Sequence, residues 1–186
     1  MSCCIEEKPA AVSAPVTGRR RFVQLAALAS GVSLLGAQLP QAHAAGVTEA
    51  LLLSCMDFRL MDEIDRYMHS RGLRDQYDHV VLAGASLGAI TDKYPAWSKT
   101  FWEHLDIAIQ LHAIKKVIVL DHRDCGAYRV ILGEAHAKTP ESETAAHAEQ
   151  LGKLRQMINE KYPKLAVETL LMSLDGKVQA VEVASR

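Results

Sequence analysis

The chain has 186 residues, of which 49% are hydrophobic and 23% are charged, a balance typical of folded globular proteins rather than disordered or fibrous ones. Its formal net charge of −1 leaves no excess of basic residues to neutralise phosphates, so nucleic acid is not an expected partner. This length and composition predict a single globular domain after an N-terminal targeting segment.

The first 44 residues have the character of that targeting segment. Three arginines at 19–21 precede a mildly apolar stretch at 22–39, and the small residues at 42–44 form a cleavage pattern. The arginines resemble a twin-arginine export signal, although Gly18 stands where that motif usually has Ser or Thr. We expect cleavage after residue 44, which leaves residues 45–186 as an exported, periplasmic domain without a stable membrane span. A retained anchor or a basic disordered tail is the alternative.

Four short apolar runs in the mature chain predict strands, at residues 50–53, 79–82, 117–120 and 167–172. Between them, apolar residues recur at spacings of three and four, which predicts helices over residues 61–68, 97–109 and 147–158. His147 opens the last pattern and is expected to be a helix-face or partly buried residue rather than a metal ligand. Asp175-Gly176 lies between two apolar runs and predicts a hairpin. The expected fold is therefore α/β, with a mostly parallel four-stranded sheet flanked by helices and an antiparallel C-terminal edge strand.

Reactive side chains follow two of the predicted strands. Cys55 comes after the first strand, with Asp57 and Arg59 at every second position beyond it, and His122 and Cys125 follow the third strand. Functional groups gather at the carboxyl ends of strands in such sheets. If the chain stays extended after Cys55, the side chains of Asp57 and Arg59 project in the same direction as its thiol.

Two thiols and one imidazole are a ligand set that suits tetrahedral Zn²⁺ and leaves one coordination position open. A structural disulfide between Cys55 and Cys125 is the alternative, because exported proteins commonly oxidise paired cysteines. His122 favours the metal, since a disulfide needs no imidazole. For Asp57 and Arg59, the alternative to a catalytic role is an ion pair that only fixes a loop.

The sequence Cys55-x-Asp57-x-Arg59, followed by His122-x-x-Cys125-Gly, resembles the zinc signature of the β-class carbonic anhydrases over roughly residues 50–183. The resemblance implies that Cys55, His122 and Cys125 hold Zn²⁺, that Asp57 accepts a hydrogen bond from the zinc-bound water, and that Arg59 holds Asp57 in place. It also implies reversible hydration of carbon dioxide to bicarbonate by zinc-bound hydroxide, in a homodimer or larger assembly. Two thiolates donate more charge to zinc than histidines do, so we expect activity to rise toward alkaline pH.

Several positions depart from the pattern of that family. Phe58, Val81 with Leu82, and Asp121 with Arg123 replace residues that are usually small, polar or glycine, and we expect these changes to surround the substrate. The small-molecule substrate can therefore be carbon dioxide or an analogue such as carbonyl sulfide or carbon disulfide. A non-catalytic relative that only binds zinc or forms the disulfide is a further alternative.

Overall fold

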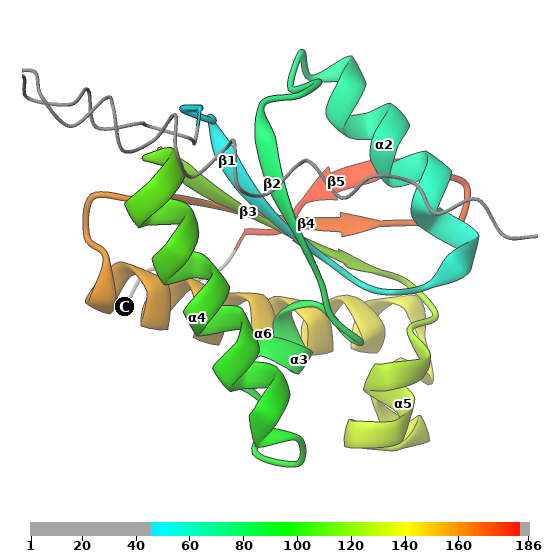
Figure 1. Cartoon of the computed structure of the whole chain (residues 1–186). Coiled ribbons are helices and arrows are strands. Elements are labelled where there is room, and N and C mark those ends of the chain that lie inside the picture. The colour runs from blue at the N-terminus through cyan, green and yellow to red at the C-terminus, as the bar shows by residue number, and fades with distance from the viewer. Residues whose placement is uncertain (1–45, 183–186) are drawn as a thin grey trace, which may run out of the picture. The chain divides into compact units, whose positions relative to one another are not determined.

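The computed structural model describes residues 46–182, so the predicted export signal and its cleavage site lie outside the described residues. In chain order (Figure 1) the elements are β1 (Ala50–Ser54), η1 (Phe58–Leu60), α2 (Met61–Ser70), β2 (Tyr77–Val81), α3 (Ser86–Ile90), α4 (Pro95–His112), β3 (Lys116–His122), α5 (Gly126–Leu132), η2 (Glu134–Ala137), α6 (Pro140–Lys161), β4 (Ala166–Met172) and β5 (Val178–Ala180).

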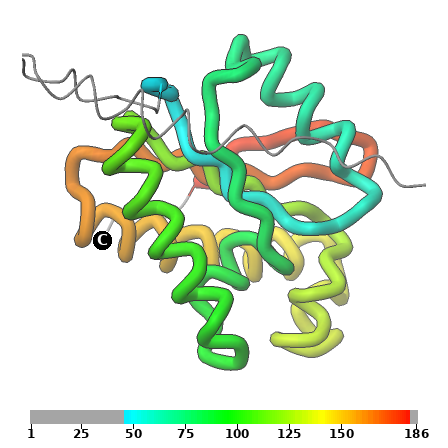
Figure 2. The backbone as a smooth tube through the Cα atoms, viewed as in Figure 1, coloured from blue at the N-terminus to red at the C-terminus, as the bar shows by residue number. Residues whose placement is uncertain are grey.

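The strands form one sheet in the order β2-β1-β3-β4-β5. β1 pairs in parallel with β2 and β3, β3 pairs in parallel with β4, and β5 returns antiparallel to β4 at the edge, a path that can be followed in Figure 2. The return follows the predicted turn at Asp175-Gly176, where Gly176 has a φ of 81°. The predicted fold class is therefore confirmed, including the four parallel strands and the antiparallel C-terminal strand.

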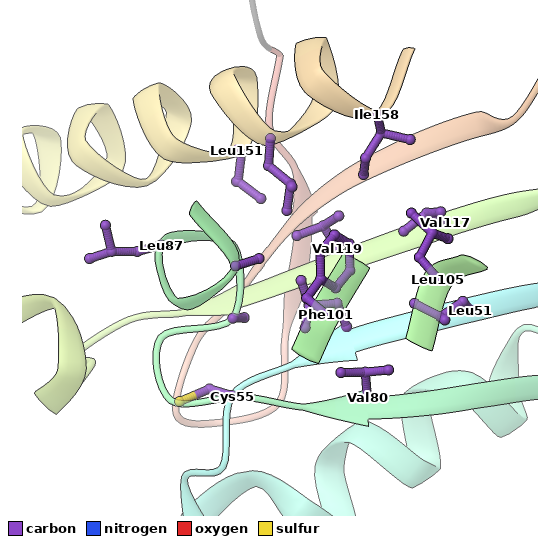
Figure 3. Close-up of a cluster of buried hydrophobic side chains, with 14 of the residues drawn as sticks. Leu51, Cys55, Val80, Leu87, Phe101, Leu105, Val117, Val119, Leu151 and Ile158 are labelled. Carbon is purple, nitrogen blue, oxygen red and sulfur yellow. The ribbon is translucent and has the colours of Figure 1, made fainter. Parts of the chain in front are cut away.

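Helices cover both faces of the sheet. Successive side chains of a strand point to opposite faces, so the apolar residues of a buried strand contribute to a core on each side. Leu51 and Leu53 of β1 join a cluster with residues of α3, α4 and α6, whereas Ala50 and Leu52 join a second cluster with residues of α2. Figure 1 shows α2 on one side of the sheet and α4 and α6 on the other. In the larger cluster, Figure 3 shows Cys55 at one end, so the core continues up to the sulfur.

The three predicted helices are present as α2, α4 and α6. α6 begins earlier than its apolar pattern, at Pro140, because Thr139 and Ser142 form a capping box with Pro140 in the first turn. It ends at Lys161, as the following Tyr162-Pro163 predicts. The short helices α3 and α5 were not predicted, and each begins shortly after the carboxyl end of a strand. No helix within residues 46–182 is long and apolar enough to span a bilayer.

Candidate metal centre

The candidate metal ligands come from the carboxyl ends of two neighbouring strands. Cys55 directly follows β1, and His122 is the last residue of β3. The two strands are parallel, with Ser54 opposite Leu120, so they deliver the residues that follow to the same edge of the sheet. This pairing brings together two side chains that are distant in the sequence.

Cys125 reaches the same edge because the chain turns sharply after His122. Asp124 adopts a φ of 55°, a left-handed conformation that Asp tolerates better than most residues. Cys125 then occupies the N-cap position of α5. The turn buries all three side chains: Cys55 is 5% exposed, and His122 and Cys125 are each 3% exposed.

The geometry of the three side chains fits one metal ion better than a disulfide. The two Sγ atoms lie 3.9 Å apart, whereas a disulfide requires about 2.05 Å and two thiolates on one tetrahedral zinc lie about 3.8 Å apart. The sulfurs and a ring nitrogen of His122 all lie within 4.8 Å of one another. His122 Nδ1 contacts the carbonyl of Arg123 at 2.8 Å, while its buried Nε2 has no hydrogen-bond partner within residues 46–182. A bound cation would satisfy that nitrogen.

The electrostatics of this cluster favour a negatively charged sulfur. A hydrogen bond from Cys125, with smaller contributions from His122 and the Gly84 N–H, lowers the pKa of Cys55 to about 4 despite its burial. The same hydrogen bond, together with burial, raises the pKa of Cys125. Burial acts to lower the pKa of His122, but attraction to the Cys55 thiolate and the hydrogen bond to the Arg123 carbonyl act in the opposite direction, and that pKa is raised. Metal binding displaces such protons, because zinc takes thiolates and a neutral imidazole.

Asp57 and Arg59 lie beside this cluster, although the chain does not stay extended as far as Arg59. The chain is extended at Asp57 and then enters the single turn η1, whose N-cap is the Asp57 side chain. Arg59 therefore folds back, and its Nε and Nη2 donate to the two carboxylate oxygens of Asp57 at 2.9 and 2.7 Å. This pairing lowers the pKa of Asp57 to about 2. Asp57 Oδ2 lies 3.9 Å from Nε2 of His122, so the carboxylate is next to the candidate metal position.

A cavity of about 380 Å³ opens beside Cys55 and Asp57. Among the residues of 46–182 that line it, Asp57 is the one that carries a charge; the others are Cys55, Met56, Phe58, Ala83, Tyr94, Trp97, Gly126, Ala127, Val130 and Ile131. Tyr94 and Trp97 stack with their ring centroids 4.1 Å apart. The site therefore combines a potential ion, one carboxylate and apolar walls.

Most of the sequence departures do not surround this cavity, which corrects the expectation from the sequence. Phe58 lines the cavity and is 86% exposed, but Val81, Leu82 and Arg123 are not among its lining residues. Arg123 instead donates to Glu143 and Thr144 of α6, at 3.0 and 2.9 Å. Its charge is thus neutralised away from the cavity, and it fixes the loop after β3 to a helix.

A family model described as "Putative carbonic anhydrase" matches residues 46–182. The chain belongs to this carbonic anhydrase family. Two uncharacterised proteins have a higher sequence identity to this chain than the solved structures described below. One, from Rickettsia conorii, is 51% identical over 131 residues, which is 70% of each chain. The other, from Rickettsia bellii, is 46% identical over 146 residues, covering 77% of this chain and 89% of the relative.

The fold also matches solved β-carbonic anhydrases. CafA of Aspergillus fumigatus matches with a TM-score of 0.50 and 15% identity, over 80% of this chain and 82% of its own. A tetrameric β-carbonic anhydrase of Sordaria macrospora matches with a TM-score of 0.51 and 10% identity, over 89% and 94% of the two chains. The family model therefore gives the family, and the shared fold is that of the β-carbonic anhydrases.

One group of residues beside the candidate metal centre was missed by sequence reasoning, and it centres on buried Asp121. Its Oδ2 accepts hydrogen bonds from Ser86 Oγ and Tyr128 Oη, both at 2.6 Å, and pairs with His147 Nδ1 at 2.9 Å. Its Oδ1 accepts from the Ser86 backbone N–H at 2.9 Å. His147 lies on the inner face of α6 and is fully rather than partly buried. The carboxylate therefore joins β3 to α3, α5 and α6 directly beside His122.

The loop before α3 supplies a further contact to the candidate ligands. Gly84 has a φ of 78°, a conformation that glycine adopts without strain, and its N–H donates to Cys55 Sγ at 3.3 Å. Asp121 holds the next turn of this loop through Ser86. A hydrogen bond to a sulfur favours its charged form, so the loop helps to keep Cys55 a thiolate.

Proposed function

We propose that this protein catalyses the reversible hydration of carbon dioxide to bicarbonate, with one Zn²⁺ held by Cys55, His122 and Cys125. The observation that carries the proposal is the meeting of these three buried donors beside an apolar cavity, in a chain of the carbonic anhydrase family. When bound, zinc would supply Lewis-acid chemistry that makes water a nucleophile near neutral pH.

The protein's own residues would bind the substrate and orient the attacking water. The apolar walls suit a nonpolar linear molecule, because they exclude water at little cost. Asp57 stays ionised well below neutral pH, since its pKa is lowered to about 2, so it can accept a hydrogen bond from the attacking water. Arg59 fixes the orientation of that carboxylate through two parallel hydrogen bonds.

Hydrolysis of carbonyl sulfide or carbon disulfide is the second candidate, because the same apolar walls would admit these small linear molecules. Asp57 is the one charged residue among the lining residues, so the described walls offer no cationic side chain to either product anion, bicarbonate or thiocarbonate. A sulfur analogue of carbon dioxide is apolar and linear, and the same chemistry would attack its carbon. Rates on carbon dioxide and on carbonyl sulfide, measured with one preparation, distinguish the two substrates.

The decisive experiment combines zinc analysis with stopped-flow measurement of carbon dioxide hydration. We expect about one zinc per chain and a rate that rises from neutral to alkaline pH. Asp57→Ala should keep its zinc and lose about 10- to 100-fold in kcat, the usual effect of removing a group that orients the reacting atoms. Asp62→Ala, on exposed α2, is the control and should leave both quantities unchanged.

Three outcomes would contradict this proposal. Full hydration activity in Asp57→Ala would remove the role given to its carboxylate. Protein purified without chelator that contained little zinc, with Cys55 and Cys125 joined as a disulfide, would favour the non-catalytic, disulfide-stabilised alternative. Zinc bound at one equivalent without activity on either substrate would favour a protein that only binds the metal.

We also propose that the protein is exported and acts as a homodimer or a larger assembly. The arginines at 19–21 and the cleavage pattern at 42–44 support export, and the tetrameric state of the Sordaria macrospora enzymes supports assembly. Mass spectrometry of the exported protein should find an N-terminus at residue 45. Light scattering should give at least twice the mass of one mature chain, and a monomer would contradict the assembly.

A further inference from the structure

Arg59 connects the turn that carries Asp57 to the loop that carries the candidate metal ligands. One edge of its guanidinium, Nε with Nη2, binds both oxygens of Asp57. Its other edge binds Asp124, with Nη1 donating to Oδ2 at 2.8 Å and Nη2 donating to the backbone carbonyl at 3.1 Å. Asp124 lies between His122 and Cys125 in the sequence, so the guanidinium spans the two loops of the site.

Asp124 is itself held firmly in place. Its backbone N–H donates to Glu143 of α6 at 2.6 Å, and its Oδ1 accepts from Arg129 of α5 at 3.0 Å. Its φ of 55° fixes the direction of the turn. The Asp124 carboxylate therefore presents a defined acceptor to Arg59, although its side chain is 47% exposed.

The contacts of Asp57 and Arg59 with each other do not by themselves fix their distance from the metal position. The two residues belong to one short turn, so they can move together as a pair. The pair is hydrogen-bonded to the β3–α5 loop through Arg59, which donates to the carboxylate and the backbone carbonyl of Asp124. Asp57 Oδ2 is already 3.9 Å from His122 Nε2, so a small movement of the pair would bring this carboxylate onto an ion held there.

We propose that Asp124 is a positioning residue, which anchors Arg59 and thereby holds the Asp57 carboxylate off the metal. This inference rests on the metal site of the proposed function. It assigns to Asp124 the choice between two states of the site, one with the fourth coordination position free and one in which Asp57 fills it. A free fourth position is what catalysis by such a site requires.

The test uses the full mature protein loaded with Co²⁺, whose visible absorption reports binding of azide to the metal. Asp124→Asn keeps a residue that tolerates the left-handed φ but places an amide against Arg59 or Arg129. We expect azide to bind about tenfold more weakly in this variant, as for other changes just outside a metal's ligands, because azide must displace Asp57. The affinity for Zn²⁺, measured by chelator competition, should not decrease.

Asp75→Asn is the matched control, because Asp75 also has a φ of 55° and lies on an exposed loop after α2. It should leave azide binding unchanged. The second comparison is the double variant, Asp57→Ala with Asp124→Asn. If Asp124 acts by holding Asp57, its substitution should have no further effect once Asp57 is removed, so the double variant should bind azide as Asp57→Ala does.

Three outcomes would overturn the inference. Asp124→Asn could weaken azide binding equally in the wild type and in Asp57→Ala. That result would mean that Asp124 shapes the β3–α5 loop itself. Unchanged azide binding in Asp124→Asn would mean that Asp124 does not control the position of the Asp57 carboxylate. Failure to take up Co²⁺ would overturn both the inference and the proposed function. The expected azide pattern without carbon dioxide hydration would instead overturn the proposed function alone.

Discussion

Neighbouring residues at the end of β3 serve different parts of the molecule, because a strand directs successive side chains to opposite sides. His122 meets the sulfurs of Cys55 and Cys125, whereas Asp121 on one side of it and Arg123 on the other contact α6. The sequence prediction assigned His122 to the metal but treated Asp121 and Arg123 as neighbours of the substrate. The alternation along the strand could have separated them, but the partners of Asp121 come from distant segments and had no sequence signal.

The Asp121 cluster should contribute measurably to stability. Burial raises the pKa of Tyr128 well above its usual value, so its hydroxyl stays protonated and donates to Asp121. Tyr128→Phe should lower the free energy of unfolding by about 1–2 kcal/mol, because a buried carboxylate loses one donor. Urea unfolding measures this change. Tyr77→Phe is the control, since its hydroxyl has no hydrogen-bond partner among the described residues; an equal loss there would contradict the assignment.

The Asp57–Arg59 pair should make stability depend on pH in the acid range. The pKa of Asp57 is lowered by Arg59 from 3.8 to about 2, so the pair stabilises the folded state fully above the unfolded pKa. This contribution is lost as the pH falls through the folded value. The difference in the free energy of unfolding between the wild type and Asp57→Asn, measured by urea unfolding, should be constant from pH 5 to 8. It should shrink between about pH 4 and pH 2. An advantage that persisted at pH 2 would show that another group is responsible.

At the level of elements, the long helices and the strands were predictable, and the two helices that complete the site were not. α2, α4 and α6 carry repeated apolar positions over several turns, which give a periodic signal. α3 has five residues and α5 has seven, too few for a clear period. The meeting of Cys55, His122 and Cys125 could be predicted because their residue types are specific, and their role as ligands stays a prediction. The turn at Phe58–Leu60 depends on local capping by Asp57.

The close packing of Gly88 in α3 against the loop before this helix should leave no room for a larger residue. A Cβ at Gly88 would lie 2.3 Å from the carbonyl oxygen of Ala83, so the loop would have to move, and Gly84 with it. Gly88→Ala should destabilise the protein by about 2 kcal/mol or more. Gly126→Ala is the control, because nothing lies within 4 Å of its Cβ and alanine favours a helix. Thermal unfolding of both variants measures the difference, and equal melting temperatures would refute the close approach.

For the whole molecule, the proposed ion would link parts of the chain that no covalent bond joins. It would tie the end of β1 to the β3–α5 turn, so its binding energy would add to the stability of the fold. Zinc at about 1,000 times its dissociation constant should stabilise the wild type by about 4 kcal/mol. Cys125→Ser should lose this zinc-dependent stabilisation, as measured by calorimetry with and without chelator. Retention of the full effect would place the metal elsewhere.

The 3.9 Å separation of the two sulfurs has a consequence for the lifetime of the protein if it is exported as proposed. Two buried thiols at that distance need only a small approach to be joined by an external disulfide oxidant. The lowered pKa of Cys55 favours its thiolate as the group that attacks the oxidant, and Cys125 then displaces the oxidant's second thiol as the leaving group. An ion that occupied both sulfurs would block this reaction. Loss of the metal in an oxidising compartment would then close the site chemically, and reactivation would require a reductant before fresh metal.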